Sequence, residues 1–199
     1  MVRPAQTARS GRTRDALRHA ALVRFLAQGV EDTSAEQIAG DAGVSLRTFY
    51  RHFTSKHDLL FADYDASLHW FREALQARSP EESIIESVQS AINTFPYDAD
   101  AVTQIAAMRA RELDPGRIVR HTRQVEAEFA DAIVEHLSRG AERPAPDERL
   151  HIIVTARCIA AAVFGAMEMW MVGDDNSSAE LSRLCGTALQ SLRAGVIPD

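Results

Sequence analysis

The sequence predicts an all-α protein of about nine helices, in which an N-terminal three-helix unit precedes a larger helical body. Apolar residues recur at spacings of three and four along most of the 199 residues. Ser, Thr or Pro precedes many of these apolar runs, and Gly follows several of them, as at helix starts and stops. We find no alternating pattern typical of a strand and no internal repeat.

The first helix is expected over residues 13–28, where Leu17, Ala21 and Phe25 share one face and Gly29 follows. Residues 1–12 lack such a pattern and predict a flexible arm. The expected divisions are therefore an arm over 1–12, a three-helix unit over 13–58 and a body over 59–199.

Two short helices are expected next, separated by a tight turn. Thr33 with Glu36 is a candidate capping box for the first of them. Gly43 can take the positive φ that ends a helix, and Ser45 is a candidate N-cap for a second helix that ends at His52. This spacing predicts a helix-turn-helix.

The body is expected to contain six further helices, each bounded by a cap or a break. The first begins after Ser55, with Asp58 completing a capping box, and the second is opened by Ser79 and Pro80. The expected ranges are 56–78, 80–95, 99–113, 117–139, 146–172 and, after Ser177 or Ser178, a last helix that ends at Ala194. Breaks are expected at 96–98, 114–116, 140–145 and 173–176.

The second helix of a helix-turn-helix enters the major groove of DNA, and its composition here suits that role. Arg47 can donate to O6 and N7 of guanine, and Lys56 follows where a phosphate contact is expected. The candidate DNA-contacting residues are Thr33, Ser45, Leu46, Arg47, Thr48, Tyr50, Arg51, His52 and Lys56.

The order of residues in this stretch resembles the TetR family of transcriptional regulators. The matching positions are Thr33, Ile38-Ala39, Ala42-Gly43-Val44-Ser45, Thr48-Phe49-Tyr50-Arg51-His52-Phe53, Lys56 and Leu59-Leu60, without a gap. Arg47 stands where the family often has a small residue, so base preference is not transferable. The resemblance implies a homodimeric, ligand-responsive repressor of a pseudo-palindromic operator, with double-stranded DNA and a small-molecule effector as partners. The alternative is an effector-independent DNA-binding protein whose C-terminal core is filled.

The charge distribution agrees with a nucleic-acid partner at the N-terminal end. Through Leu60 the chain has 9 Lys and Arg against 6 Asp and Glu, whereas the rest has 13 against 22. The overall net charge of −6 therefore combines a basic head with an acidic body.

Several classes of protein and site are not expected. No apolar run reaches the roughly 18 residues of a transmembrane helix, and no apolar segment follows the basic N-terminus, so a cytoplasmic protein is expected. Cys158 and Cys185 lack metal-ligand spacing and are expected to be buried thiols. We find no catalytic motif, so neither an enzyme nor a cofactor is predicted.

A homodimer interface is expected on the last two helices. The helix over 146–172 is apolar on two opposite faces, which indicates burial on two sides. The Ala and Gly residues around Gly165 would allow a close approach by a partner helix. The candidate interface residues are Val154, Cys158, Ala161, Gly165, Leu181, Leu184, Cys185, Ala188 and Leu192.

A ligand pocket is expected where polar groups lie on apolar helix faces of the body. Arg109 is its candidate cation, and the guanidinium would pair either with Glu112 or with an anionic group of a largely apolar effector. Candidate lining residues are Trp70, Phe71, Phe95, Arg109, His121, Thr122, Val125, Phe129, His136 and Arg157, all of which could instead be core residues. Repression and activation are both compatible with these features.

Overall fold

The computed structural model describes residues 4–79, 81–95, 99–139, 144–175 and 177–195. Over these residues the chain forms nine α-helices and one 3-10 helix, η1, and no strand, which confirms the predicted all-α class. The chain divides into two compact units, residues 1–63 with 100–119 and residues 64–99 with 120–199.

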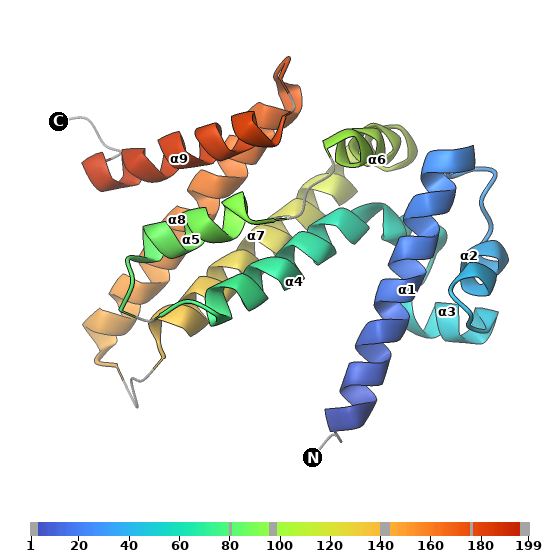
Figure 1. Ribbon diagram of the computed structural model, residues 1–199, viewed down its shortest axis with the longest axis horizontal. Coiled ribbons are helices and arrows are strands. Elements are labelled where there is room, and N and C mark those ends of the chain that lie inside the picture. The colour runs from blue at the N-terminus through green and yellow to red at the C-terminus, as the bar shows by residue number, and fades with distance from the viewer. Residues whose placement is uncertain (1–3, 80, 96–98, 140–143, 176, 196–199) are drawn as a thin grey trace. The chain divides into compact units, whose positions relative to one another are not determined.

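The first unit contains four elements from the N-terminal part of the chain, α1 (Pro4–Gln28), α2 (Ala35–Asp41), α3 (Leu46–His52) and η1 (Lys56–Phe61). Figure 1 shows α1 lying alongside the α2–α3 pair. The fully buried side chains of Leu17, Phe25, Ile38 and Phe49 form the core between these helices. This packing confirms the predicted three-helix unit.

The first unit also contains α6 (Ala99–Glu112), apart from its first residue, and the start of α7 (Pro115–Leu137). The compact units therefore do not divide at the predicted boundary between residues 58 and 59. Sequence order places α6 in the body, but a buried anchor described below fixes α6 to the end of η1.

The predicted flexible arm over residues 1–12 is also wrong from Pro4 onward, because α1 begins there rather than at Thr13. Pro is favoured in the first turn of a helix, where its missing N–H is not needed. Once a helix has formed, adding further turns costs little even without an apolar stripe. Residues 10–12 are accordingly helical and exposed.

The predicted caps are correct for α3 and α9 (Ser178–Ala194) but shifted elsewhere. Ser34 rather than Thr33 caps α2, and Gln37 rather than Glu36 completes its capping box. Ser55 and Asp58 form the predicted capping box, but the helix they open is η1, which leads into α4 (Ala62–Gln76).

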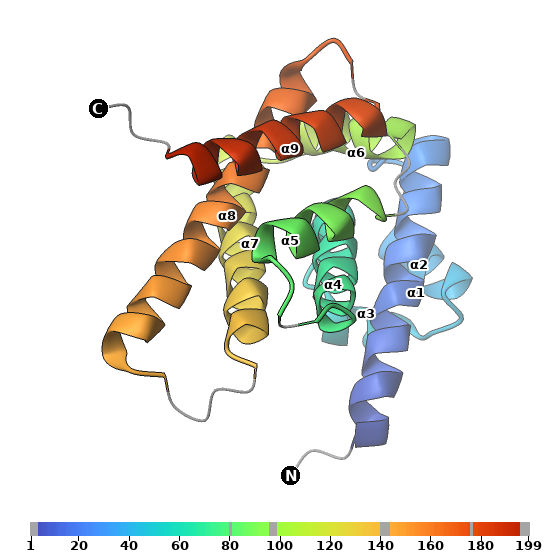
Figure 2. The same cartoon turned by 60° about the vertical axis from the view of Figure 1, so that its left-hand side comes forward.

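The second unit contains most of α4 together with α5 (Ile84–Asn93), the rest of α7, α8 (Pro146–Val172) and α9. Figures 1 and 2 show α8 and α9 side by side, with α5 next to α9, and these are pairs in contact. In the core, the rings of Phe71 and Phe129 stack at 4.3 Å between centroids, and Phe164 meets Phe129 edge-on at 5.3 Å.

The predicted helix over 80–95 begins later, at Ile84 after the N-cap Ser83. Glu82 binds Arg78 and also accepts a hydrogen bond of 3.0 Å from Ser87, so the expected first turn is held as a loop. Pro80, residues 96–98, residues 140–143 and Asn176, which belong to the predicted start and breaks, lie outside the described residues.

Helix α8 is long and apolar enough to cross a membrane by length and composition alone. Part of this apolar surface faces the core of the second unit, where Ile159, Val163 and Trp170 are buried. The opposite face carries exposed apolar residues, among them Val154 and Met169. The apolar composition of α8 is therefore accounted for by core packing on one face, and its opposite face is apolar and exposed.

Candidate functional site

The turn between α2 and α3 has the predicted helix-turn-helix geometry. Gly43 has φ of 66°, a conformation that disfavours side chains larger than hydrogen. The Val44 amide donates to the Ala39 carbonyl at 2.9 Å and closes the turn. The hydroxyl of Ser45 then accepts from the Thr48 amide at 3.2 Å, which confirms Ser45 as the N-cap of α3.

Helix α3 is held by its aromatic side and presents its polar side to solvent. Phe49 is fully buried, with Phe53 at 6.0 Å between ring centroids. Arg47, Tyr50 and Arg51 are exposed, while the other candidate residues of this helix, Leu46, Thr48 and His52, are partly buried. Arg47, Tyr50 and Arg51 of the predicted set thus lie on the exposed face of α3.

Thr33 does not belong to this exposed set. Its side chain is 1% exposed, and its hydroxyl donates to the Gly29 carbonyl at 2.7 Å. The Thr33 amide is also used, because it donates to the Val30 carbonyl at 3.2 Å. The predicted DNA contact of the Thr33 side chain is therefore wrong, and this residue instead fixes the loop between α1 and α2.

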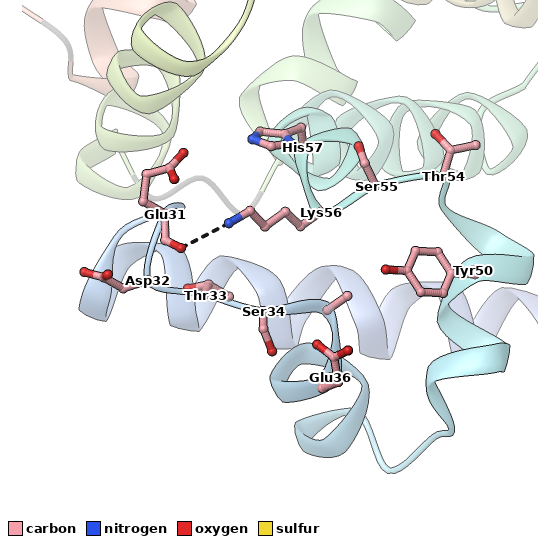
Figure 3. Close-up of a pocket in the computed structure, with 11 residues that line it drawn as sticks. Glu31, Asp32, Thr33, Ser34, Glu36, Tyr50, Thr54, Ser55, Lys56 and His57 are labelled. Carbon is pink, nitrogen blue, oxygen red and sulfur yellow. Dashed lines mark hydrogen bonds between the residues drawn. The ribbon is translucent and has the colours of Figure 1, made fainter.

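Lys56 has a structural role that the sequence did not predict, and its phosphate contact stays a prediction. Its ammonium donates to the Val30 carbonyl at 2.7 Å and to the Glu31 carbonyl at 3.2 Å, which ties η1 to the loop between α1 and α2. Figure 3 shows the bond to Glu31. A cavity of about 430 Å³ lies beside it. The lining residues are Glu31, Asp32, Thr33, Ser34, Ala35, Glu36, Tyr50, Thr54, Ser55, Lys56 and His57.

Ion pairs brace the helices that carry this surface. Arg24 of α1 binds Asp41 of α2 through hydrogen bonds of 2.5 and 2.9 Å. Arg117 binds Asp58 at 2.5 Å. Burial raises the pKa of Asp58, but hydrogen bonds from Thr54 and Ser55 and the charge of Arg117 outweigh it and lower the pKa overall.

His52, at the end of α3, is favoured in its neutral form. Desolvation lowers its pKa first, and the charges of Arg51 and Arg14 lower it further. A neutral imidazole has a single N–H donor and no charge, and the phosphate contact of His52 stays a prediction.

Arg109 is placed differently from the prediction. Its side chain is buried and donates to the Leu60 carbonyl at 2.8 Å and to the Asp63 carboxylate at 2.5 Å. Glu112, the predicted protein partner, binds Arg111 instead at 2.8 Å. Arg109 is thus the anchor of α6 within the first unit, and the predicted pairing with Glu112 is wrong. The alternative pairing with an anionic effector stays a prediction.

The remaining candidate pocket residues divide into core and surface. Phe71, Val125, Phe129 and His136 are buried in the second unit. Trp70 donates to the Ala91 carbonyl at 3.3 Å, and its ring meets Phe95 at 6.1 Å. His121 lies 6.0 Å from Tyr64 between ring centroids, Thr122 is partly buried, and Arg157 is exposed. Arg157 is therefore misplaced in the predicted set.

His136 is the buried polar group with the most distinctive environment among the described residues of the second unit. It is 1% exposed, and its Nδ1 donates to the Leu75 carbonyl at 3.0 Å. Its Nε2 has no hydrogen-bond partner among the described residues. Burial is the main cause that lowers its pKa, and Arg139 adds to that effect. An uncharged ring with a free acceptor atom therefore lies inside the body.

The candidate dimer residues are exposed, partly buried or fully buried within their own chain. Val154, Cys158, Ala161 and Gly165 of α8 are exposed, and Leu181, Leu184, Ala188 and Leu192 of α9 are partly buried. Cys185 is 1% exposed and belongs to the core of its own unit, so its predicted interface role is wrong. Cys158 was predicted to be a buried thiol, and this prediction is wrong for the chain by itself, because Cys158 is exposed.

Sequence reasoning missed three groups of residues. Asp63 is the partner of Arg109, Ser34 with Gln37 is the cap of α2, and Glu31, His57 and Glu112 form a cluster in the first unit. The cap had a visible signal, because Ser34 precedes Gln37 by three residues as a capping box requires. The residues of the other two groups are far apart in the sequence, and only the tertiary fold brings them together.

The profile of the family described as "Bacterial regulatory proteins, tetR family" matches residues 17–62. The transcriptional regulator TcmR of Streptomyces glaucescens is 29% identical over 199 residues, covering 94% of this chain and 86% of that protein. The putative mycofactocin biosynthesis transcriptional regulator MftR of Mycobacterium tuberculosis is 23% identical and covers 94% and 95% of the two chains.

Solved structures share the fold. Thermus thermophilus FadR, a TetR-family repressor in complex with lauroyl-CoA, has a TM-score of 0.55 at 21% identity, covering 94% of this chain and 96% of that one. A putative regulator from Syntrophomonas wolfei has a TM-score of 0.58 at 16% identity, with coverages of 93% and 96%.

Proposed function

This chain belongs to the TetR family of transcriptional regulators, and from that premise we propose that it is a cytoplasmic, homodimeric repressor that a small molecule releases from its operator. The exposed face of α3 carries the proposal. Arg47, Tyr50 and Arg51 are exposed there, and buried Phe49 fixes their orientation.

On DNA, α3 would lie in the major groove with its N-terminal residues at the base edges. Arg47 is the second residue of α3 and is exposed, so it is the residue we assign to a guanine. Tyr50 and Arg51 would hold the backbone. Lys56 would add the charge of its ammonium beside a phosphate while it keeps its two carbonyl contacts.

The dimer would form through the exposed apolar face of α8 and the partly buried stripe of α9. Small residues on this face, Ala161 and Gly165, would let a partner helix approach closely. An added Cβ at Gly165 meets no atom within 4 Å apart from the neighbouring backbone of α8 itself, so this position is open in the monomer. Two-fold symmetry would then present two α3 helices to an operator with half-sites about 34–36 Å apart, or a multiple of that distance.

The effector would bind in the second unit and be mostly apolar with a hydrogen-bonding end. The aromatic residues around Phe129 would supply apolar contact, and the Nε2 of His136 would accept a hydrogen bond. FadR, which has the same fold, binds lauroyl-CoA, an amphipathic molecule. A ligand that binds more tightly when the two helix-turn-helix units of the dimer are arranged in a way that does not fit DNA would shift the population away from the DNA-binding form. The rival is a filled body without an effector, in which no ligand changes operator affinity.

Selection of bound duplexes from a random library by the full-length chain tests the proposal. An inverted repeat with two equivalent half-sites is the expected product. The Arg47→Ala variant should select a repeat that is relaxed at one position in each half. The matched control is Arg123→Ala, which removes an exposed arginine of the second unit. A selected sequence without an inverted repeat would contradict dimeric recognition.

A further inference from the structure

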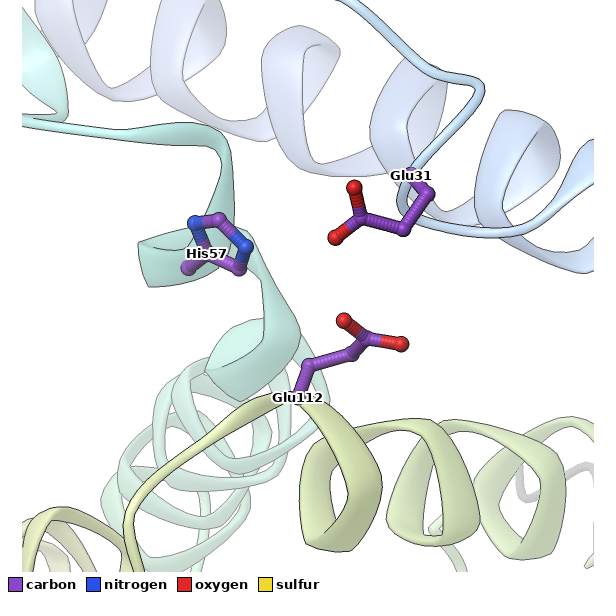
Figure 4. Close-up of side chains that lie close together, drawn as sticks. All are labelled: Glu31, His57 and Glu112. Carbon is purple, nitrogen blue, oxygen red and sulfur yellow. The ribbon is translucent and has the colours of Figure 1, made fainter.

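Three side chains that can bind a metal ion converge within the first unit (Figure 4). Glu31 comes from the loop after α1, His57 from η1 and Glu112 from the last position of α6. One ligand atom from each lies within 4.8 Å of the other two. Figure 4 shows the two carboxylates and the imidazole pointing toward a common centre.

The two carboxylates lie close together. A carboxylate oxygen of Glu31 and one of Glu112 are within 4.8 Å of each other, and a ring nitrogen of His57 lies within the same distance of both. Carboxylates held this close repel each other in their charged forms, and a cation between them removes that repulsion.

From this convergence, we propose that Glu31, His57 and Glu112 form a binding site for a divalent first-row transition-metal ion. An imidazole with two carboxylates is a donor set for Zn²⁺, Co²⁺, Ni²⁺ or Mn²⁺, whereas Mg²⁺ and Ca²⁺ prefer oxygen ligands throughout. Three protein ligands leave at least one coordination position for water or another ligand.

The required movement is small. Ligand atoms around a tetrahedral Zn²⁺ are about 3.4 Å apart, since each metal–ligand distance is about 2.0–2.2 Å. The three atoms must therefore close by at most about 1.4 Å from their limit of 4.8 Å. Glu31 is exposed and can rotate, while its backbone carbonyl is held by Lys56 at 3.2 Å.

A metal ion here would tie the loop before the helix-turn-helix to η1 and to the end of α6. All three ligands belong to the same compact unit. The test therefore needs neither operator DNA nor an effector.

Metal titration of the full-length, tag-free chain after treatment with a chelator tests the proposal. Zn²⁺ should bind saturably with one ion per chain, as measured by calorimetry. Co²⁺ should give a visible absorption band with the intensity of a four- or five-coordinate site. Mg²⁺ should bind at least tenfold more weakly, because it does not favour the imidazole ligand.

The substitutions His57→Gln, Glu31→Gln and Glu112→Gln should each weaken Zn²⁺ binding at least tenfold. Helical circular dichroism of each metal-free variant should match that of the wild type, and Glu31→Gln is the safest of them because its side chain is exposed. The controls are His69→Gln, which removes an exposed histidine beside Glu73, and Cys158→Ser, which removes the exposed thiol. Both should bind Zn²⁺ as the wild type does. Lack of saturable binding, or unchanged binding by the His57→Gln variant, would overturn the proposal.

Discussion

Replacing Arg109 by Met tests the structural role of the anchor that holds α6. The guanidinium is almost fully buried, donates to the Leu60 carbonyl and the Asp63 carboxylate, and lies 5.3 Å from the centre of the Phe61 ring. Met has a similar length but no donor. The Arg109→Met variant would therefore leave the Asp63 carboxylate, whose side chain is 15% exposed, without its cation.

Removing one partner of a buried ion pair costs about 3–5 kcal/mol. For a chain of this size, that loss lowers the midpoint of thermal unfolding by roughly 6–20 °C. The double variant Arg109→Met, Asp63→Leu should recover part of this loss, because it removes the stranded charge as well. Arg183→Met is the control, since its partner Glu180 lies on the same exposed turn of α9 and little change is expected.

Thermal and denaturant unfolding at one fixed protein concentration provide the measurement, because a dimer's stability depends on concentration. Operator release by the effector should persist in whatever fraction of the Arg109→Met variant remains folded. Unchanged stability together with loss of the effector response would refute the reasoning and would assign Arg109 to a ligand.

Three further perturbations have defined outcomes. Gly165→Arg should give a stable monomer in sedimentation and a faster reaction of the exposed Cys158 with a thiol reagent. Burial raises the pKa of Cys185 to about 11, so this thiol should stay unreactive in the native protein. A dimer of unchanged affinity would place the interface elsewhere. The pKa of His136 is lowered in the folded chain, so its stabilising contribution is complete above about pH 6.5, the unfolded value, and is lost as the pH falls toward the lowered folded pKa. His136→Gln should therefore flatten the fall of the unfolding free energy below about pH 6.5, and an unchanged slope would contradict this. Lys56→Ala should lower the free energy of unfolding by about 1–3 kcal/mol, because two carbonyl contacts are lost. It should also weaken binding to all DNA sequences alike, whereas a loss of affinity for one sequence alone would show base reading by Lys56.

Local signals in the sequence were sufficient for most helices. The turn at Gly43 and the cap at Ser45 were predicted correctly because both depend on residues a few positions apart. Helix α1 was predicted too short, since a polar segment next to a formed helix can extend it without an apolar stripe. The start of α5 was misplaced because Arg78 and Ser87 hold Glu82 in a loop.

The site could be predicted where it lies within one contiguous motif. Arg47 and Tyr50 are exposed as expected, because the period of α3 and buried Phe49 together fix its orientation. Arg109 was assigned wrongly because its partners, Leu60 and Asp63, are more than forty positions away in the chain. Pairings at such separations are decided by tertiary packing, for which a single sequence has no local pattern.

The central claim, that α3 reads DNA bases through Arg47, is tested most directly by comparing the affinity of two proteins for two DNAs. Fluorescence anisotropy at one salt concentration would give the dissociation constants of wild type and Arg47→Ala for the selected operator and for a scrambled duplex. We expect the substitution to cost about 1–3 kcal/mol per half-site on the operator and considerably less on the scrambled duplex. Equal losses on both duplexes would show that Arg47 binds only the backbone and would contradict the claim.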